Sequence, residues 1–295
     1  MTIFSANFQS ALDARVARAI TEGVELSNVV YPQYFNGLTS DGAYEIAAAF
    51  SGLTTAVAKQ EGADFTMDAP VQRYSYTLTH GEIGLAFKVT HAMKSDDKLR
   101  MVDKWAMGLG RAGVEKMCVD HANILNRAFN NTYTYGDGKE LCATDHPLAG
   151  GTAQNELSTP ADLSTSSLNE ALYTMKRTVD HRGKIAPLTP IRMLVPPEQE
   201  RLAFQLNGSE LEPSTTDNQA NFFRGKFQVI VDPYLTDTDA WFLQAALHGL
   251  VSYEREALNF GTYVEQSSLS QVYWCLARYS VGAEEWRGIF GTPGA

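Results

Sequence analysis

The chain has few of the features that mark secreted or membrane proteins. Its three cysteines, Cys118, Cys142 and Cys275, lie far apart and are odd in number, which favours reduced thiols over a disulfide scaffold. No run approaches the roughly 18 apolar residues of a membrane span, and the N-terminus lacks the basic-then-apolar layout of a secretory signal. We therefore expect a cytosolic chain.

Positive charge is also scarce. The 24 Lys and Arg residues are outnumbered by 34 Asp and Glu, which gives a formal net charge of -10. Tight phosphate binding needs clustered Lys and Arg, so gripping nucleic acid is excluded as the main function. What is present is ordinary: 295 residues, 44% hydrophobic and 20% charged, are enough for one large domain or two interleaved ones.

A β-hairpin pattern opens the most informative stretch, residues 62–130. Residues 83–89 alternate between larger apolar and smaller or polar side chains, which predicts a strand with one apolar face. Residues 71–79 are expected to pair with it, with His80 and Gly81 as the turn. A two-stranded ribbon is marginal in water, so this one should lie against something else. The apolar members are Ile83, Leu85, Phe87 and Val89.

A helix of unusual length should follow the hairpin. Ser95 is placed as its N-cap, with Asp96 and Asp97 in the first turn, where carboxylates complement the helix dipole. No proline interrupts the pattern before Asn130, so the helix would be on the order of 50 Å long. The expected stripe is Leu99, Val102, Ala106, Leu109, Ala112, Val119, Ala122 and Leu125, broken chiefly at Lys116.

An N-terminal helix is indicated by apolar residues that recur every four positions and end near Gly23. Two interpretations stay open for this stripe: it packs on its own domain, or it reaches a neighbouring subunit. The stripe consists of Phe8, Leu12, Val16 and Ile20. Residues 36–37 then predict a turn, and residues 43–50 a short helix.

The rest of the chain predicts mixed structure. Residues 132–162 are rich in turn formers and indicate a long loop with short strands. Ser167 and Glu170 have capping-box spacing for a helix with Leu168, Leu172, Met175 and Val179 on its apolar face. Strands are expected at 192–195, 227–231, 241–247 and within 251–281, and a helix at 200–206 between Pro197 and Gly208. The fold class is α+β.

Candidate chemical motifs lack the context that they need. Gly108, Gly110 and Gly113 spell GxGxxG, but inside a helix, where they favour close packing of another backbone over cofactor binding. Cys118 and His121 lie one helical turn apart without a second ligand pair, so a buried thiol beside a hydrogen-bonded imidazole is preferred to a metal site.

Two further candidates are equally weak. His146 could serve Cys142 or a serine as a base, yet nothing nominates a third member or an oxyanion hole, and a loop-stabilising histidine is preferred. Asp232, Asp237 and Asp239 miss the spacing of a calcium loop and suggest a solvated turn. We therefore predict no catalytic, cofactor or metal residue and no enzymatic activity.

Several stretches resemble a known family, the major capsid proteins of tailed double-stranded-DNA phages with the Hong Kong 97 type of fold. The resemblance covers nearly the whole chain and lies mainly in the order of its parts. None of its stretches is a catalytic motif. The most specific are Lys59 to Asp68, Gly84 to His91, Ser95 to Asp97, Cys142 to Gly151, Leu194 to Glu198 and Asp232 to Trp241.

The resemblance implies a division of the chain into six segments. These are an N-terminal arm at 1–34, a first piece of a peripheral domain at 35–56, an extended loop at 57–91, a spine helix at 92–130, an axial domain at 131–250, and a return to the peripheral domain at 251–295. Residues implied to contact other subunits are Phe8, Leu12, Val16, Ile20, Glu61, Asp64, Tyr74, Tyr76, Ile83, Leu85 and Phe87, with Gly108, Gly110 and Gly113 as spine-helix packing positions.

The resemblance also implies partners. The subunit would assemble with itself into hexamers and pentamers of an icosahedral shell that encloses double-stranded DNA, in the host cytoplasm, with a separate scaffold, a portal and decoration proteins. Lys59 and Lys88 bracket the extended loop, which is weak support for covalent cross-links, and we expect none. The competing hypotheses are a hydrolase that uses His146 and a scaffolding protein that forms no shell.

Overall fold

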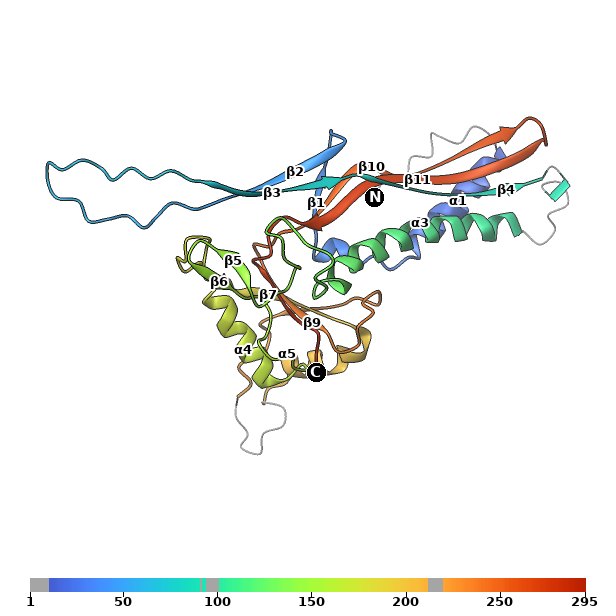
Figure 1. The fold of residues 1–295 in the computed structure, drawn as a ribbon. Coiled ribbons are helices and arrows are strands. Elements are labelled where there is room, and N and C mark those ends of the chain that lie inside the picture. The colour runs from blue at the N-terminus through green and yellow to red at the C-terminus, as the bar shows by residue number, and fades with distance from the viewer. Residues whose placement is uncertain (1–10, 91, 94–100, 212–219) are drawn as a thin grey trace.

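The computed structural model describes residues 11–90, 92–93, 101–211 and 220–295 and consists of two domains and one long projection. We call the domain that contains the longest helix the spine domain and the other the second domain. The projection is a β-hairpin, residues 44–79, which extends far beyond both domains (Figure 1). We call it the long hairpin.

The spine domain is a four-stranded sheet with two helices on one face. The strand order is β1 (Asn36–Thr39), β10 (Leu250–Glu265), β11 (Ser270–Ala283) and β4 (Gly81–Val89), and β1 alone runs parallel to its neighbour. The helices are α1 (Ala11–Glu25) and α3 (Met101–Asn126), and α3 runs beneath the sheet in Figure 1. A short 3-10 turn, η2 (Tyr31–Gln33), follows α1.

The two helices approach each other closely at glycines. A Cβ on Gly110 of α3 would lie 2.4 Å from the carbonyl oxygen of Ile20, and one on Gly23 of α1 would lie 2.2 Å from that of Met107. Backbone can meet backbone here only because neither position carries a side chain. Val16 and Ile20 are buried in the same core, so this part of the N-terminal stripe packs on its own domain.

The second domain is built on another four-stranded sheet. Its order is β12 (Ile289–Thr292), β9 (Trp241–Ala245), β7 (Pro190–Val195) and β8 (Gln228–Val231). The helices α4 (Thr165–Lys176) and α5 (Glu200–Gly208) share its core, in which Met193, Trp241 and Phe290 are fully buried. The 3-10 turn η3 (Pro197–Gln199) precedes α5, and β5 (His146–Leu148) pairs with β6 (Gly151–Ala153).

The predicted pairing of residues 71–79 with residues 83–89 is wrong. Strand β3 (Gln72–Thr79) pairs with β2 (Tyr44–Phe50) to form the long hairpin, whereas β4 pairs along its whole length with β11. His80 therefore joins two strands that belong to different sheets, and no hairpin turn forms there. The apolar face of β4 must be buried against another layer. Pairing with β11 places this face against α3, which covers it.

Other local predictions also need correction. Residues 44–50 form a strand where a helix was expected for residues 43–50, and Asn36 and Gly37 lie in β1 where a turn was expected. The capping box of α4 is made by Ser164 and Ser167, not by Ser167 and Glu170. The C-terminal segment does not stay in the spine domain, because β12 pairs with β9.

The long helix is present, with a different buried face. The predicted cap at Ser95 and the residues Asp96, Asp97 and Leu99 lie outside the described residues. Helix α3 ends at Asn126, before Asn130. Ala112, Lys116 and Val119 of the expected stripe are not buried. The buried face is Val102, Ala106, Leu109, Gly110, Gly113, Val114, Met117, Cys118, His121, Ala122 and Leu125.

Candidate assembly surfaces

The long hairpin has one apolar face that no described part of the subunit covers. Along β2 the side chains of Tyr44, Ile46 and Phe50 point outward and are exposed, while the intervening residues are half-buried. The partner strand β3 adds Thr77 and other polar residues to the same outward face. An exposed apolar stripe with a polar border is typical of a surface that binds another protein.

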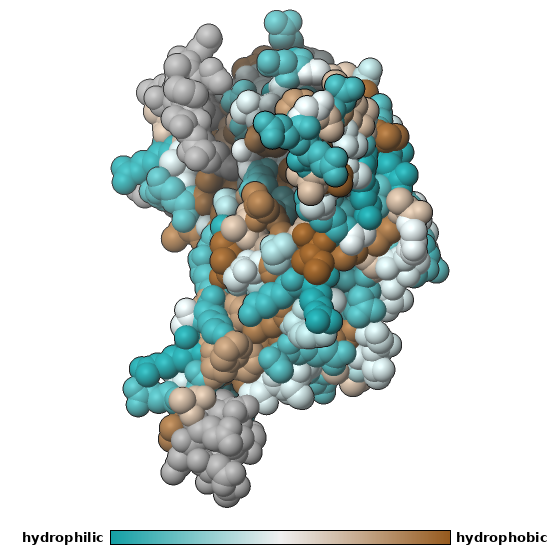
Figure 2. All heavy atoms as spheres, turned by 90° about the vertical axis from the view of Figure 1, so that its left-hand side faces the viewer, coloured by the Kyte–Doolittle hydropathy of each residue, from teal (hydrophilic) through white to brown (hydrophobic). Residues whose placement is uncertain are grey.

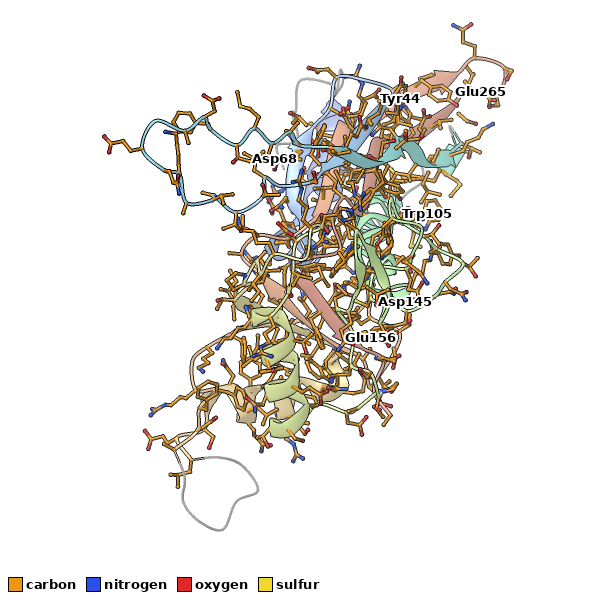
Figure 3. The ribbon with its side chains drawn as sticks, turned by 60° about the vertical axis from the view of Figure 1, so that its left-hand side comes forward. Tyr44, Asp68, Trp105, Asp145, Glu156 and Glu265 are labelled. Carbon is orange, nitrogen blue, oxygen red and sulfur yellow. The ribbon has the colours of Figure 1, made fainter. Side chains whose placement is uncertain are left out.

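The loop at the end of the long hairpin continues this apolar character. We call residues 51–71 the tip loop. Its Phe65 is 79% exposed and its Met67 is 92% exposed, although both are large hydrophobic residues. Glu61 and Asp64 are exposed beside them, and the Lys59 ammonium lies 5.0 Å from the ring centre of Phe65. Figure 3 shows the tip loop projecting alone from the body of the subunit.

The inner side of the long hairpin rests on the second domain. A Cβ on Gly136 would lie 2.4 Å from the ring of Tyr74, and the ring centres of Tyr76 and Tyr135 are 5.7 Å apart. Tyr74 and Tyr76, expected to contact another subunit, are therefore engaged within their own. They support the hairpin from below and leave its outward face free. Figure 2 looks at the molecule from the side of the hairpin and shows hydrophobic residues gathered across the middle of the surface.

A second apolar surface lies between β4 and α3. The groove there has a volume of about 520 Å³ and is lined by Leu85, Phe87, Trp105 and Gly108, with Lys88 and Lys104 at its border. Leu85 and Trp105 are exposed, and the rings of Phe87 and Trp105 meet edge to face. Figure 3 labels Trp105 on α3, away from the long hairpin. We call this surface the β4–α3 groove.

The other residues predicted to contact neighbouring subunits fall into two groups: some pack within their own subunit, and one faces the groove. Ile83 and Phe87 pack against the core of their own spine domain, whereas Leu85 between them faces the groove. Phe8 lies outside the described residues, and Leu12 lies in α1.

The three glycines of α3 occupy different surroundings. Gly110 meets α1, and a Cβ on Gly113 would touch Leu258 at 3.0 Å. A Cβ on Gly108 would meet nothing within 4 Å, because this residue lies in the open groove. Packing at Gly108 therefore has no partner within the described part of the subunit.

The sequence interpretation did not name five exposed hydrophobic residues of the long hairpin: Tyr44, Ile46, Phe50, Phe65 and Met67. The signal for the first three was present, since Tyr44, Ile46 and Phe50 fall on every second or fourth position of a strand. The alanines between them suggested a helix instead. Nothing in the local pattern of the tip loop marks Phe65 and Met67 as exposed.

His146 is held in a structural network. Its Nδ1 lies 2.6 Å from Asp137 Oδ2 and its Nε2 lies 2.9 Å from Asn155 Oδ1, while its ring stacks on Trp286. The imidazole is fully buried, so neither ring nitrogen is available to a substrate. Asn155 also accepts from the Ala143 amide and donates to the carbonyls of Leu141 and of Ile289 in β12. The geometry supports a loop-stabilising histidine.

The remaining candidates are also structural. His121 contacts the Met117 carbonyl and the Ser252 hydroxyl, and burial lowers its pKa to about 4. The three cysteines are free and buried. The carboxylate of Asp232 accepts a hydrogen bond from the Tyr34 hydroxyl and is itself buried, which corrects the solvated turn expected for it.

A search of the described residues for metal sites and membrane spans found neither. No group of three or more His, Cys, Asp or Glu side chains is arranged to hold a metal ion within residues 11–90, 92–93, 101–211 and 220–295. Over the same ranges, none of the helices combines the length and the apolar character that crossing a membrane requires.

Comparison with known proteins identifies the family of the chain. The family model described as phage capsid protein matches residues 74–291. No curated protein sequence matches the chain.

Solved structures share the fold at low sequence identity. The capsid of bacteriophage JBD30 has a TM-score of 0.60 and 13% identity, over 80% of this chain and 96% of that one. The mature capsid of bacteriophage PhiM1 has a TM-score of 0.60 and 12% identity, over 99% and 90%. A virus-like particle from Pyrococcus furiosus has a TM-score of 0.57 and 9% identity, over 96% and 100%.

A spine helix under a twisted sheet, a projecting hairpin and a separate second domain define a capsid subunit of the Hong Kong 97 type. The chain belongs to the phage capsid protein family. It is a capsid protein, a structural component of the virion and not an enzyme.

Proposed function

We propose that the long hairpin of one subunit docks on the β4–α3 groove of the next, and that this contact closes subunits into hexamers and pentamers. The exposed apolar face of the hairpin carries the proposal, because Tyr44, Ile46 and Phe50 have no cover within the described subunit. Hairpin and groove are different surfaces of the same chain. Such heterologous contacts close into rings when the rotation between subunits permits it.

Charge supports this pairing of surfaces. The tip loop carries Glu61 and Asp64, whereas Lys104 borders the groove. Complementary charge at the border of an apolar contact selects the register and the partner more than it adds affinity. Gly108 on the floor of the groove leaves room for a neighbour's backbone to approach.

The positions of the two domains in the ring are a further part of the proposal. The spine domain is peripheral in the ring, and the second domain, residues 127–245 with β12, is axial. The long hairpin, residues 44–79, replaces residues 57–91 as the extended loop. The N-terminal residues, including Phe8 and Leu12, remain a proposed contact with neighbours.

The assembled shell encloses double-stranded DNA without reading its sequence. The net charge of -10 supports this, since a strongly basic inner wall would hold the genome by counterion release while it is being packaged. Assembly takes place in the host cytoplasm with a separate scaffold, a portal and decoration proteins. No covalent cross-link is proposed: Lys88 pairs with Glu265, and Lys59 lies over Phe65.

Aspartate substitutions on the hairpin test the docking. We expect Ile46→Asp and Phe50→Asp to leave the subunit folded and to abolish rings and shells in negative-stain images. An unpaired carboxylate buried at an interface costs several kcal/mol. Leu247→Asp is the matched control, because Leu247 is equally apolar and exposed but lies in the turn between β9 and β10. Normal particles from both hairpin variants would refute the proposal.

A further inference from the structure

Beyond its tyrosines, the long hairpin is held to the second domain by the side chain of Arg182. The Nη1 of Arg182 donates to Asp68 Oδ2 at 2.7 Å, and its Nη2 donates to the Ala69 carbonyl at 2.9 Å and to Ser51 Oγ at 3.3 Å. Ser51 belongs to the outgoing side of the hairpin, and Asp68 and Ala69 belong to the returning side. One guanidinium thus binds both sides.

These contacts lie where the ladder of the hairpin ends. The Ser51 amide donates to the Val71 carbonyl, and the Val71 amide donates to Ser51 Oγ. Asp68 Oδ2 also accepts the Thr54 amide at 2.7 Å, across the neck of the tip loop. Figure 3 shows Asp68 where the tip loop leaves the body of the subunit. These hydrogen bonds join the two sides of the loop at its neck.

The turn that presents Arg182 is itself held by hydrogen bonds. Asp180 Oδ1 accepts the backbone amides of Arg182 at 2.8 Å and Lys184 at 2.9 Å, and the Asp180 amide donates to the Lys184 carbonyl. Gly183 adopts a φ of 78°, which glycine tolerates without strain. Arg182 is thus anchored to a preformed turn of the second domain, and it couples the position of that domain to the neck of the tip loop.

We propose that Arg182 is the positioning residue of the tip loop: its guanidinium fixes the direction in which Phe65 and Met67 leave the subunit. This inference rests on the proposed function, because the direction matters for the shell only if neighbours bind the hairpin. Arginine suits the role, since a planar fork reaches several oxygen acceptors at once, whereas a lysine ammonium is a compact point charge on a flexible stem.

The contact stays charged through the neutral range of pH. The Thr54 amide and then the Arg182 guanidinium lower the pKa of Asp68 to about 2. We expect added salt to weaken the contact, because the pair is partly exposed and such pairs are screened.

Distance measurements within one full-length subunit test the inference. Spin labels at Gln60→Cys in the tip loop and Asn169→Cys on α4 report the direction of the loop, since the native cysteines are buried. Labelled subunits are diluted with unlabelled ones, so that only distances inside a subunit are recorded. We expect Arg182→Ala to widen the distance distribution roughly twofold, because the loop then samples several directions.

Two further variants separate positioning from general stability. Arg182→Lys keeps the positive charge but loses the planar guanidinium. We expect the width of its distance distribution to lie between those of Arg182→Ala and the parent chain. Arg224→Ala removes an exposed ion pair with Glu210 elsewhere in the second domain and should leave the distribution unchanged. An unchanged distribution in Arg182→Ala overturns the inference, whatever the particles look like.

Particle images complete the test. We expect Arg182→Ala to yield shells of mixed size or open sheets. A widened distribution with uniform, normal shells overturns the claim that loop direction controls the shell. Neither result bears on whether the hairpin docks at all, because that question is answered separately by Ile46→Asp and Phe50→Asp.

Discussion

Two alanine substitutions on one helix should have opposite effects on stability. Gly108 and Gly110 lie two residues apart in the interior of α3. Replacing an exposed helical glycine by alanine stabilises by roughly 0.5–1 kcal/mol, because alanine loses less conformational entropy on folding. Gly108 meets this condition, since a Cβ there touches nothing. We expect Gly108→Ala to raise the free energy of unfolding by that amount.

Gly110→Ala gains the same propensity but creates a clash. Its Cβ would lie 2.4 Å from the Ile20 carbonyl oxygen and 3.3 Å from the Val24 nitrogen, both backbone atoms of α1. No side-chain rotation relieves such a contact, so α1 must move away and loosen the burial of Val16 and Ile20. Overpacking costs roughly 1–3 kcal/mol, and the upper half of that range applies when backbone is the obstacle. After the propensity gain, the net loss is about 1–2 kcal/mol.

Urea unfolding of the full-length subunit measures both effects. The two variants should differ by about 2–3 kcal/mol at an unchanged m-value, with Gly108→Ala above the parent and Gly110→Ala below it. Equal shifts of the same sign would refute the close approach of α1 and α3 at Gly110. The Gly108→Ala variant also tests whether assembly needs an open β4–α3 groove, because it places a methyl group on the floor of that groove.

Two further predictions concern buried polar groups of the second domain. Burial and the nearby charge of Glu140 raise the pKa of Glu156 to about 7, above its ordinary value of 4.5, so the folded state is penalised once this carboxyl ionises. Stability should fall as pH rises from about 4.5 through 7, and Glu156→Gln should remove part of that fall in urea midpoints measured at several pH values; identical pH profiles would contradict it. Asn155→Ala should lower the free energy of unfolding by about 3 kcal/mol or more, because the Ala143 amide loses its buried acceptor and the carbonyls of Leu141 and Ile289 lose their donor. A loss under about 1 kcal/mol in calorimetry would contradict this network.

The capsid class could be predicted from the sequence, because it depends on local patterns and on their order. The long helix, the α4 and α5 helices and the β-rich segments after residue 226 all lie close to their predicted places. The candidate catalytic and metal motifs could also be judged from the sequence around them, since none had the flanking residues or spacing that its chemistry requires. His146 was expected to stabilise a loop, and its contacts with Asp137 and Asn155 agree.

Strand partners were decided only by the tertiary structure. Alternation along residues 83–89 shows that one face is apolar, but backbone hydrogen bonds are the same for any strand, so the pattern cannot choose between β3 and β11. The distant strand was selected because pairing with β11 places Ile83 and Phe87 over α3 in a common core.

The same holds for the residues that face other subunits. The sequence by itself determined which residues are apolar, including Ile46, Phe50 and Met67, and it indicated the long helix, but it assigned the projecting hairpin to the wrong pair of strands. Only the tertiary structure decided that these residues stay exposed while Tyr74 and Tyr76 rest on the second domain. The physical reason is that burial depends on what packs above a side chain, and that is contributed by segments far away in the chain.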